Sequence, residues 1–254
     1  DSGTKVEEGI VIEDDAGNQF VWIPVGEYKV STAINSTGKL TNNLSRRTFT
    51  SSSATEVSGD EAIDVNYYGE GDSRSVAYNQ IGEFKTSATN NGGYYIGRYE
   101  QGEGNVCKSG VNPYTNITRD QAKSQAEVMY SGNSYITSEL ISSYAWDTAL
   151  NFICQTNSVG YVLATTTSNK YGNIATDSRT QTGKYEADKY NNIYDLLGNC
   201  IEWSTEHSTS STGNSVTRGS PYVATGYAAV RTPSAINSSM EYCSFRVQLY
   251  LQNK

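Results

Sequence analysis

The side chains that most often carry out catalysis or bind transition metals are scarce in this chain. Its 254 residues include one histidine, His207, and four cysteines. One histidine excludes every histidine-rich metal site and leaves any histidine-dependent catalysis to His207 alone. Because His207 lies in a polar stretch, with no second histidine and no paired cysteine nearby, we expect it to be solvated and not catalytic.

The four cysteines are Cys107, Cys154, Cys200 and Cys243. They form no CxxC pair, so a zinc site is not expected, and they are too few and too far apart for a disulfide scaffold. The sequence therefore favours free, partly buried thiols. A disulfide between Cys200 and Cys243 is the alternative.

Charge and hydropathy exclude two further classes of protein. The chain has 19 Lys and Arg against 27 Asp and Glu, a net charge of −8, so no nucleic-acid partner is expected. It contains no run of 18 apolar residues, so no segment is expected to insert into a membrane. The 20 tyrosines suit a recognition surface instead, since tyrosine gives broad contact area at low entropic cost.

The order of the expected strands and helices, which must position these residues, indicates a single α+β domain over residues 1–254. Two short strands are expected around a turn at residues 14–18, where Asp, Gly and Asn cluster between β-branched and aromatic residues. Residues 31–75 are rich in Ser, Thr and Asn and are expected to form a surface excursion. Short strands and loops fill the chain after residue 192, without the alternation of strand and helix that a parallel sheet requires.

Two helices are expected between these regions. Thr118 and Gln121 have the spacing of a capping box, which predicts a helix that begins there. A second helix is predicted to begin at Thr137 and to run to Phe152, with apolar residues three and four apart.

The stretch 192–203 carries a recognisable motif. Its sequence, Asn-Ile-Tyr-Asp-Leu-Leu-Gly-Asn-Cys-Ile-Glu-Trp, resembles the Tyr-Asp-Met-x-Gly-Asn-Val-x-Glu-Trp signature of the formylglycine-generating enzyme and sulfatase-modifying factor superfamily. Three further segments follow the order of that family: 20–26, 138–152 with Trp146, and Arg218-Gly219-Ser220 followed by Ser244-Phe245-Arg246. The resemblance covers residues 9–30 and 92–254. It implies a C-type-lectin-like fold with two helices, short twisted sheets and long ordered loops.

The chain lacks the catalytic cysteines that the enzymes of this family use. The resemblance places their two copper-binding cysteines near Val223 and Ala228, but no cysteine occurs between residues 201 and 242. Without thiolates there is neither a soft ligand for copper nor a nucleophile. The iron-dependent branch of the family would need a histidine cluster. We therefore expect no enzymatic activity, no catalytic residues and no required cofactor.

A non-catalytic branch offers another use of the scaffold. The chain is similar to the variable proteins of diversity-generating retroelements in its two anchors, Arg218-Gly219 and Phe245-Arg246, between which the mutated positions of those proteins lie. The resemblance thus implies a variable region at 218–246 that binds a protein or a glycan. The residues expected to supply this face are Tyr222, Thr225, Tyr227, Arg231, Asn237, Ser239, Glu241 and Tyr242.

The same resemblance implies a structural calcium site in the acidic motif. Asp195 and Glu202 would give side-chain oxygens to the metal, and Gly198 and Cys200 would give carbonyl oxygens. Calcium takes six to eight hard oxygens, of which such a turn can provide several. The alternative is that Glu202 bonds to backbone amides and Asp195 caps the turn.

The residues around these sites are expected to form the scaffold. Arg218 and Arg246 are predicted to satisfy buried carbonyls or a buried carboxylate, as a bidentate guanidinium can. The three tryptophans, Trp22, Trp146 and Trp203, are predicted to lie in the core.

The sequence as a whole therefore predicts a binding module that is secreted or displayed on a cell surface or phage particle. Two alternatives stay open: an oxidoreductase of the same superfamily with unrecognised chemistry, and a pilus-like or other structural subunit of a surface.

Overall fold

The computed structural model describes residues 5–59, 74–168, 170–174, 176, 178–208 and 214–252. Its architecture is α+β, as the sequence predicts, with small open sheets and helices packed against them. Among the described residues there is no helix that is both long and apolar enough to cross a membrane.

Two open sheets carry most of the strands. The larger has the order β1-β2-β7-β15-β8, and all of its pairs are antiparallel. Its strands are β1 (Val11–Glu13), β2 (Gln19–Pro24), β7 (Gly93–Gly97), β15 (Val247–Leu251) and β8 (Ile136–Leu140). The predicted turn between β1 and β2 is confirmed, and the carboxylate of Asp14 accepts hydrogen bonds from the backbone and side chain of Asn18 to close it.

The second sheet has the order β13-β12-β11-β14, in which only the β11–β14 pair is parallel. Its strands are β13 (Arg231–Ala235), β12 (Asn214–Arg218), β11 (Ile201–His207) and β14 (Cys243–Phe245). Because β14 and β15 are separated by the single residue Arg246, the chain passes directly from one sheet to the other there.

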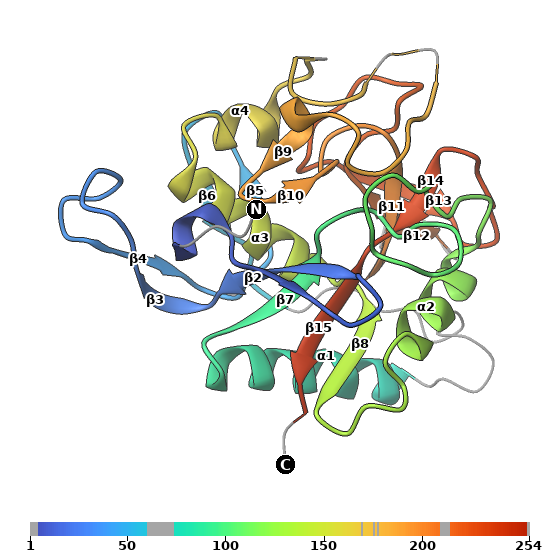
Figure 1. Ribbon diagram of the computed structural model, residues 1–254, viewed down its shortest axis with the longest axis horizontal. Coiled ribbons are helices and arrows are strands. Elements are labelled where there is room, and N and C mark those ends of the chain that lie inside the picture. Colours follow the sequence, from blue (N-terminus) through green and yellow to red (C-terminus); the bar gives the residue numbers. More distant parts are fainter. Residues whose placement is uncertain are drawn as a thin grey trace.

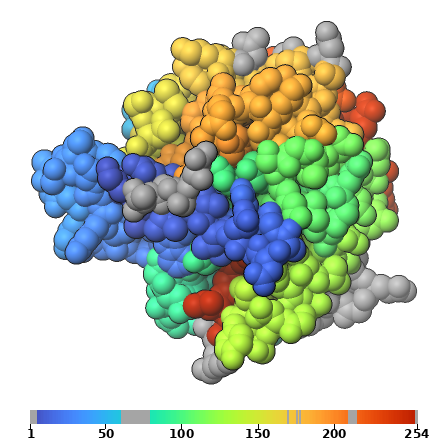
Figure 2. Space-filling model, viewed as in Figure 1, coloured from blue at the N-terminus to red at the C-terminus, as the bar shows by residue number. Residues whose placement is uncertain are grey.

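Three two-stranded pairs complete the strands of the described residues: β3 (Gly26–Lys29) with β4 (Lys39–Asn42), β5 (Arg47–Phe49) with β6 (Ala54–Glu56), and β9 (Lys189–Tyr190) with β10 (Ile193–Tyr194). The first two lie within the predicted excursion at 31–75 or at its border. The β3–β4 hairpin projects from the body of the protein, at the left of Figures 1 and 2. The excursion is not uniformly exposed, however, since Asn42 and Arg47 are buried. Residues 60–73 lie outside the described part.

The described part of the chain has four α-helices where the sequence analysis predicts two. They are α1 (Arg74–Asn90), α2 (Arg119–Val128), α3 (Ser143–Thr156) and α4 (Gly160–Thr165), with 3-10 turns at Val6–Glu8 and Glu186–Asp188. Helix α1 packs against β7 and β15, at the bottom of Figure 1. Its buried residues Ile81, Phe84 and Ala88 are spaced three and four apart, so the helical pattern was present and was missed.

One helix start is confirmed and the other is wrong. Thr118 and Gln121 form the predicted capping box at the start of α2. The second helix begins at Ser143 and not at Thr137, because residues 136–140 pair with β15 as strand β8. The hydroxyl of Ser142 accepts a hydrogen bond from the amide of Ala145 and caps α3.

The core consists of two clusters on either side of the larger sheet's strands. One surrounds α3 and contains Trp146, and the other contains Trp203 and Phe245. Trp146 and Trp203 are fully buried, as predicted. Trp22 is only half-buried and packs edge-on against Tyr95, so it does not lie fully in the core as predicted.

Candidate functional site

The motif at 192–203 is anchored by a buried ion pair between Glu202 and Arg246. The guanidinium donates to both carboxylate oxygens, at 2.6 Å and 3.0 Å, and also to the carbonyls of Gly97 and Tyr194. Both partners are fully buried. The predicted role of Arg246 as an anchor is confirmed, because one side chain satisfies four acceptors that would otherwise be unpaired.

Arg218 anchors the second sheet in the same manner. Its guanidinium donates to Asp147 of helix α3 at 2.6 Å and to Ser143 at 3.0 Å, and all three side chains are buried. Arg231 on strand β13 pairs with the other oxygen of Asp147 and with Glu206. Strands β12 and β13 are therefore fixed to α3 by a network of alternating charges, which confirms the predicted role of Arg218.

The acidic motif does not fit the calcium ion that the resemblance implies. Both oxygens of Glu202 accept from Arg246, whose positive charge takes the place that a cation would need. Asp195 accepts a hydrogen bond from the amide of Gly183. The described residues contain no group of three or more His, Cys, Asp or Glu side chains arranged to hold a metal.

Glu100 forms a buried acidic cluster with Asp195 and Glu202. No pattern in the sequence indicates this third carboxylate. It accepts from the amide of Cys200 at 2.7 Å and from the side chain of Asn199 at 2.6 Å. Burial raises the pKa of Asp195 to about 7 and holds the pKa values of Glu100 and Glu202 above their usual range. The neutral forms of the three carboxyl groups are therefore favoured more than those of exposed carboxyl groups.

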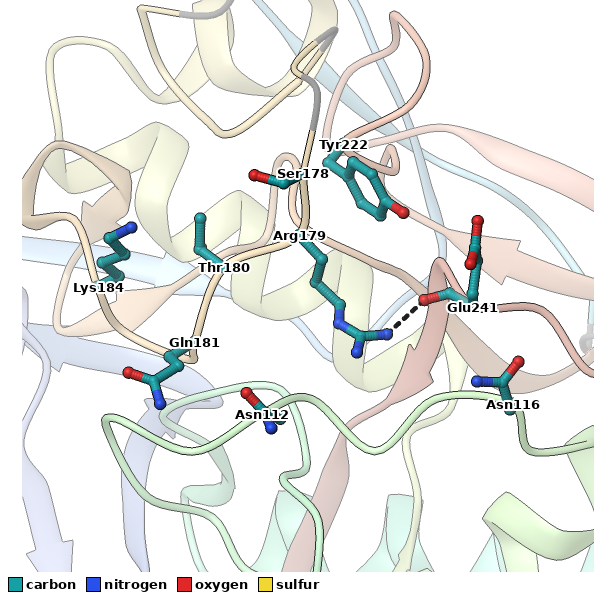
Figure 3. Close-up of a pocket in the computed structure, with 9 residues that line it drawn as sticks. All are labelled: Asn112, Asn116, Ser178, Arg179, Thr180, Gln181, Lys184, Tyr222 and Glu241. Carbon is teal, nitrogen blue, oxygen red and sulfur yellow. Dashed lines mark hydrogen bonds between the residues drawn. The ribbon is translucent and has the colours of Figure 1, made fainter.

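The structure also has a wide polar hollow of about 560 Å³ (Figure 3). Three parts of the chain far apart in sequence form its walls. The residues that line it are Asn112, Asn116, Ser178, Arg179, Thr180, Gln181, Lys184, Tyr222 and Glu241. All nine carry hydrogen-bonding groups and none is aliphatic, so the hollow suits a polar ligand.

Asn199 joins the acidic cluster to two walls of the hollow. Its side-chain oxygen accepts from the amide of Thr180 at 2.9 Å, and its backbone carbonyl accepts from the amide of Tyr222 at 2.9 Å. Asn199 has a left-handed φ of 57°, a conformation that Asn tolerates better than most residues. Gly198 before it also has a positive φ and lies so close to Asn173 that a Cβ would come within 2.5 Å of its amide nitrogen. The Gly-Asn pair of the motif thus positions the hollow.

The remaining wall is held by Thr182 and Arg179. The backbone of Thr182 exchanges hydrogen bonds with Gly110 and Val111, which fixes the loop that carries Asn112. Arg179 donates through Nη1 to the carbonyl of Glu241 at 2.6 Å, the bond drawn in Figure 3, and to the hydroxyl of Thr115. The segment around 240 is tied to this loop as well, because the amide of Asn116 donates to the carbonyl of Met240.

A second hollow of about 400 Å³ lies on the other side of the same segments. Pro221 and Tyr242 line it, whereas their chain neighbours Tyr222 and Glu241 line the polar hollow. Its residues come mostly from the stretch 219–242 and include Val230, Pro233 and Met240, but no charged side chain. The expected variable region 218–246 therefore borders both hollows.

Comparisons with solved structures show the fold. The structure of PvdO from Pseudomonas aeruginosa matches with a TM-score of 0.55 and 11% sequence identity, over 96% of this chain and 98% of that chain. The crystal structure of CarF matches with a TM-score of 0.51 and 13% identity, over 63% of this chain and 87% of that chain.

The chain has a formylglycine-generating-enzyme-like fold. The resemblance noted in the sequence is thereby confirmed at the level of the fold, which is all that identities of 11% and 13% establish. Treponema denticola variable protein 1 is a weaker structural match, with a TM-score of 0.42 and 13% identity over 61% of this chain and 84% of that chain. No protein-family model matches the sequence, and a search of curated proteins found no relative.

The structure places the eight residues predicted to bind a ligand in three different settings. Five are exposed: Thr225, Tyr227, Asn237, Ser239 and Glu241. Tyr242 is half-buried, and Tyr222 is 8% exposed, with its ring forming a wall of the polar hollow. Arg231 is the residue least suited to the predicted role, because Asp147 and Glu206 already neutralise its guanidinium.

Most of the polar hollow leaves no pattern in the sequence. The segment 178–184 is a loop without a recognisable motif, and Asn112 and Asn116 lie in another loop. No local pattern reveals that these loops meet, because tertiary hydrogen bonds through Thr182 and Asn199 bring them together. The motif residue Asn199 was the one available signal.

No cysteine and no histidine is among the described residues that line the two hollows. All four cysteines are free and buried, so the predicted free thiols are confirmed and the Cys200–Cys243 disulfide is not formed. Burial raises the pKa of Cys107 to about 11 and that of Cys154 to about 12, and it raises the pKa values of Cys200 and Cys243 well above the usual range. His207 lies at the end of β11 and is half-buried, not fully solvated as predicted.

Proposed function

We propose that this protein is a non-enzymatic binding protein that recognises a protein or glycan through the polar hollow and the adjoining surface of 218–246. The observation that carries the proposal is the construction of the hollow. Polar side chains from three separate segments line one cavity, and Asn199 fixes two of its walls to a buried, ion-paired base. A rigid base under surface loops is how binding sites are commonly built.

The state of the cysteines supports binding over thiol chemistry. A thiolate is the reactive form of cysteine, and burial opposes its formation at all four positions. None of the four lines either hollow. The sequence also lacks cysteines at the positions where the resemblance places the copper ligands of the enzymes.

The proposal includes the diversification of 218–246 by a retroelement, and display on a cell surface or phage particle. These parts rest on the resemblance of the Arg218-Gly219 and Phe245-Arg246 anchors. Sequencing the DNA beside the gene tests them. A near-copy template and a reverse transcriptase gene are expected, and their absence would remove diversification from the proposal while leaving binding intact.

Binding through the hollow is tested by filling it. The wild-type protein is screened against immobilised neutral and acidic oligosaccharides and against a displayed peptide library, and the binders are measured again with Asn112→Trp. Asn112 is exposed at the wall of the hollow, so the indole should occupy the cavity without changing the core. Thr86→Trp, on an exposed position of α1, is the matched control.

The expected result is a binder whose affinity falls at least tenfold with Asn112→Trp and does not change with Thr86→Trp. Equal affinity in both variants would place recognition elsewhere. Mass spectrometry of the ligand after incubation gives the second readout, and a covalent change produced by the wild-type protein would favour an enzyme instead.

A further inference from the structure

We propose that the polar hollow binds a carboxylate-bearing saccharide, with the carboxylate on Arg179. This inference rests on the proposed function and names its ligand class. It starts from an imbalance of charge: the chain carries a net charge of −8, yet the hollow is lined by two cations, Arg179 and Lys184, and by one carboxylate, Glu241.

Arg179 is held in place with one edge of its guanidinium open. The Nη1 nitrogen is taken by the carbonyl of Glu241 and the hydroxyl of Thr115. Within the described part of the chain, Nε and Nη2 have no hydrogen-bond partner. These two nitrogens form the fork that pairs with both oxygens of a carboxylate.

The orientation of Arg179 directs this fork into the hollow. Figure 3 shows the guanidinium between the walls, with one nitrogen toward the Glu241 carbonyl and the others toward the side on which Asn112 and Gln181 lie. Because the Nη1 bonds already fix the side chain, little rotamer entropy remains to be lost when a ligand binds.

Lys184 adds a second positive charge to the cavity. Its ammonium lies over the ring of Tyr185, 5.0 Å from the centroid, so the side chain is directed by its neighbour. An ammonium is a point charge without a fork, and we assign it a general attraction for anions. Arg179 therefore orients the carboxylate of the ligand, and Lys184 adds positive electrostatic potential to the hollow.

The neutral residues of the hollow favour a saccharide over a peptide. Five of them carry amides or hydroxyls, namely Asn112, Asn116, Ser178, Thr180 and Gln181. Such groups donate and accept hydrogen bonds at once, as the hydroxyls of a sugar do. Tyr222 adds an aromatic ring with a polar end. The apolar side chain of a peptide would find no aliphatic residue in this cavity.

The test uses trigalacturonate and its methyl ester, in which neutral methyl ester groups replace the carboxylates. Affinities are measured by calorimetry at low salt, with Gly-Gly-Gly and its C-terminal amide as the peptide pair. We expect trigalacturonate to bind at least tenfold more tightly than its ester, and we expect neither peptide to bind. Addition of 0.5 M NaCl should weaken the binding of the acid and leave that of the ester unchanged.

Three variants assign the effect to residues. Arg179→Gln should abolish the preference for the acid over the ester, and Lys184→Gln should lower the affinity for the acid about threefold. Lys170→Gln is the matched control, because Lys170 is exposed, lies over the ring of its neighbour Tyr171 in the same way and does not line the hollow. Lys184 is exposed, so Lys184→Gln should fold. It therefore provides a test of the charge in the hollow even if Arg179→Gln does not fold.

The outcomes separate this inference from the proposed function. Equal affinity for the acid and the ester, lost with Asn112→Trp, would overturn the carboxylate preference and leave binding through the hollow intact. Binding of the peptide acid alone would overturn the saccharide. A preference for the acid that persists in Arg179→Gln and Lys184→Gln would overturn the assigned residues.

Discussion

The backbone carbonyl of Asn199 accepts a hydrogen bond of 2.9 Å from the amide of Tyr222. Asn199 belongs to the buried acidic motif, and Tyr222 belongs to the expected variable region. The side chain of Asn199 also donates a hydrogen bond to Glu100 and accepts one from the amide of Thr180. One buried residue thus holds two walls of the polar hollow to the base of the fold.

Asn199→Asp tests this junction. The substitution keeps the shape of the side chain but replaces the NH₂ group, which donates to Glu100 at 2.6 Å, with an oxygen. Two acceptors would then face each other in a buried site, so we expect a loss of about 2–3 kcal/mol in the free energy of unfolding, measured in urea. Asn237→Asp, at an exposed position, is the control. Equal stability of the two variants would show that Asn199 is not a junction.

Arg246→Lys tests the anchor beneath the motif. A lysine ammonium cannot reach both oxygens of Glu202 and the carbonyls of Gly97 and Tyr194 together. We expect unfolding in urea to show a loss of about 3–5 kcal/mol, as for other broken buried pairs. Lys39→Ala breaks the exposed pair with Glu27 and should cost less than about 1 kcal/mol. A small loss for Arg246→Lys as well would contradict the anchoring role.

Removal of calcium should leave stability unchanged. Glu202 is engaged by Arg246 through both oxygens, so the acidic motif offers no site that a chelator could empty. We expect the melting midpoint to be the same, within one degree or so, in excess EDTA and in millimolar CaCl₂. A midpoint several degrees higher with calcium would mean that the motif rearranges around the ion.

Stability should depend on pH through Glu139. Burial raises the pKa of Glu139 from 4.5 to about 7, although Tyr250 and Gln248 donate hydrogen bonds to it. The folded state therefore binds more protons than the unfolded state between these pH values, and stability falls as the pH rises across that window.

Glu139→Gln should remove this share of the pH dependence, which amounts to about 3 kcal/mol for a shift of this size. Urea unfolding of both proteins at pH 4.5 and pH 7.5 measures it. The decline that remains in the variant is expected from the other buried carboxylates whose pKa values burial raises, namely Asp188, Asp195, Glu100 and Glu202. The same slope in the variant and the wild type would mean that the pKa of Glu139 is the same in the folded and unfolded states.

The sequence predicts the scaffold better than the site because the scaffold rests on local patterns and on a motif. The capping box at Thr118, the turn at Asp14 and the anchoring of Arg246 all follow from residue types at fixed spacing. Helix α3 shows the limit of such patterns, because the pairing of β8 with β15 overrides the apolar periodicity before Ser143.

The polar hollow could not be predicted in the same way. Loops around residues 112 and 180 have no regular pattern, and their meeting depends on bonds made by Thr182 and Asn199. Arg231 shows what position along the chain leaves out: it belongs to the expected variable region, and the fold pairs it with Asp147 and Glu206. Exposure and charge pairing are properties of the tertiary structure.

Mapping of backbone amide chemical shifts during titration with the tightest ligand of the binding screen tests the central claim most directly. The ¹⁵N-labelled protein should show perturbations concentrated at the walls of the polar hollow, at residues 112–116, 178–184, 222 and 241. Perturbations that cluster on the β3–β4 hairpin or on α1, with the hollow unchanged, would contradict the account.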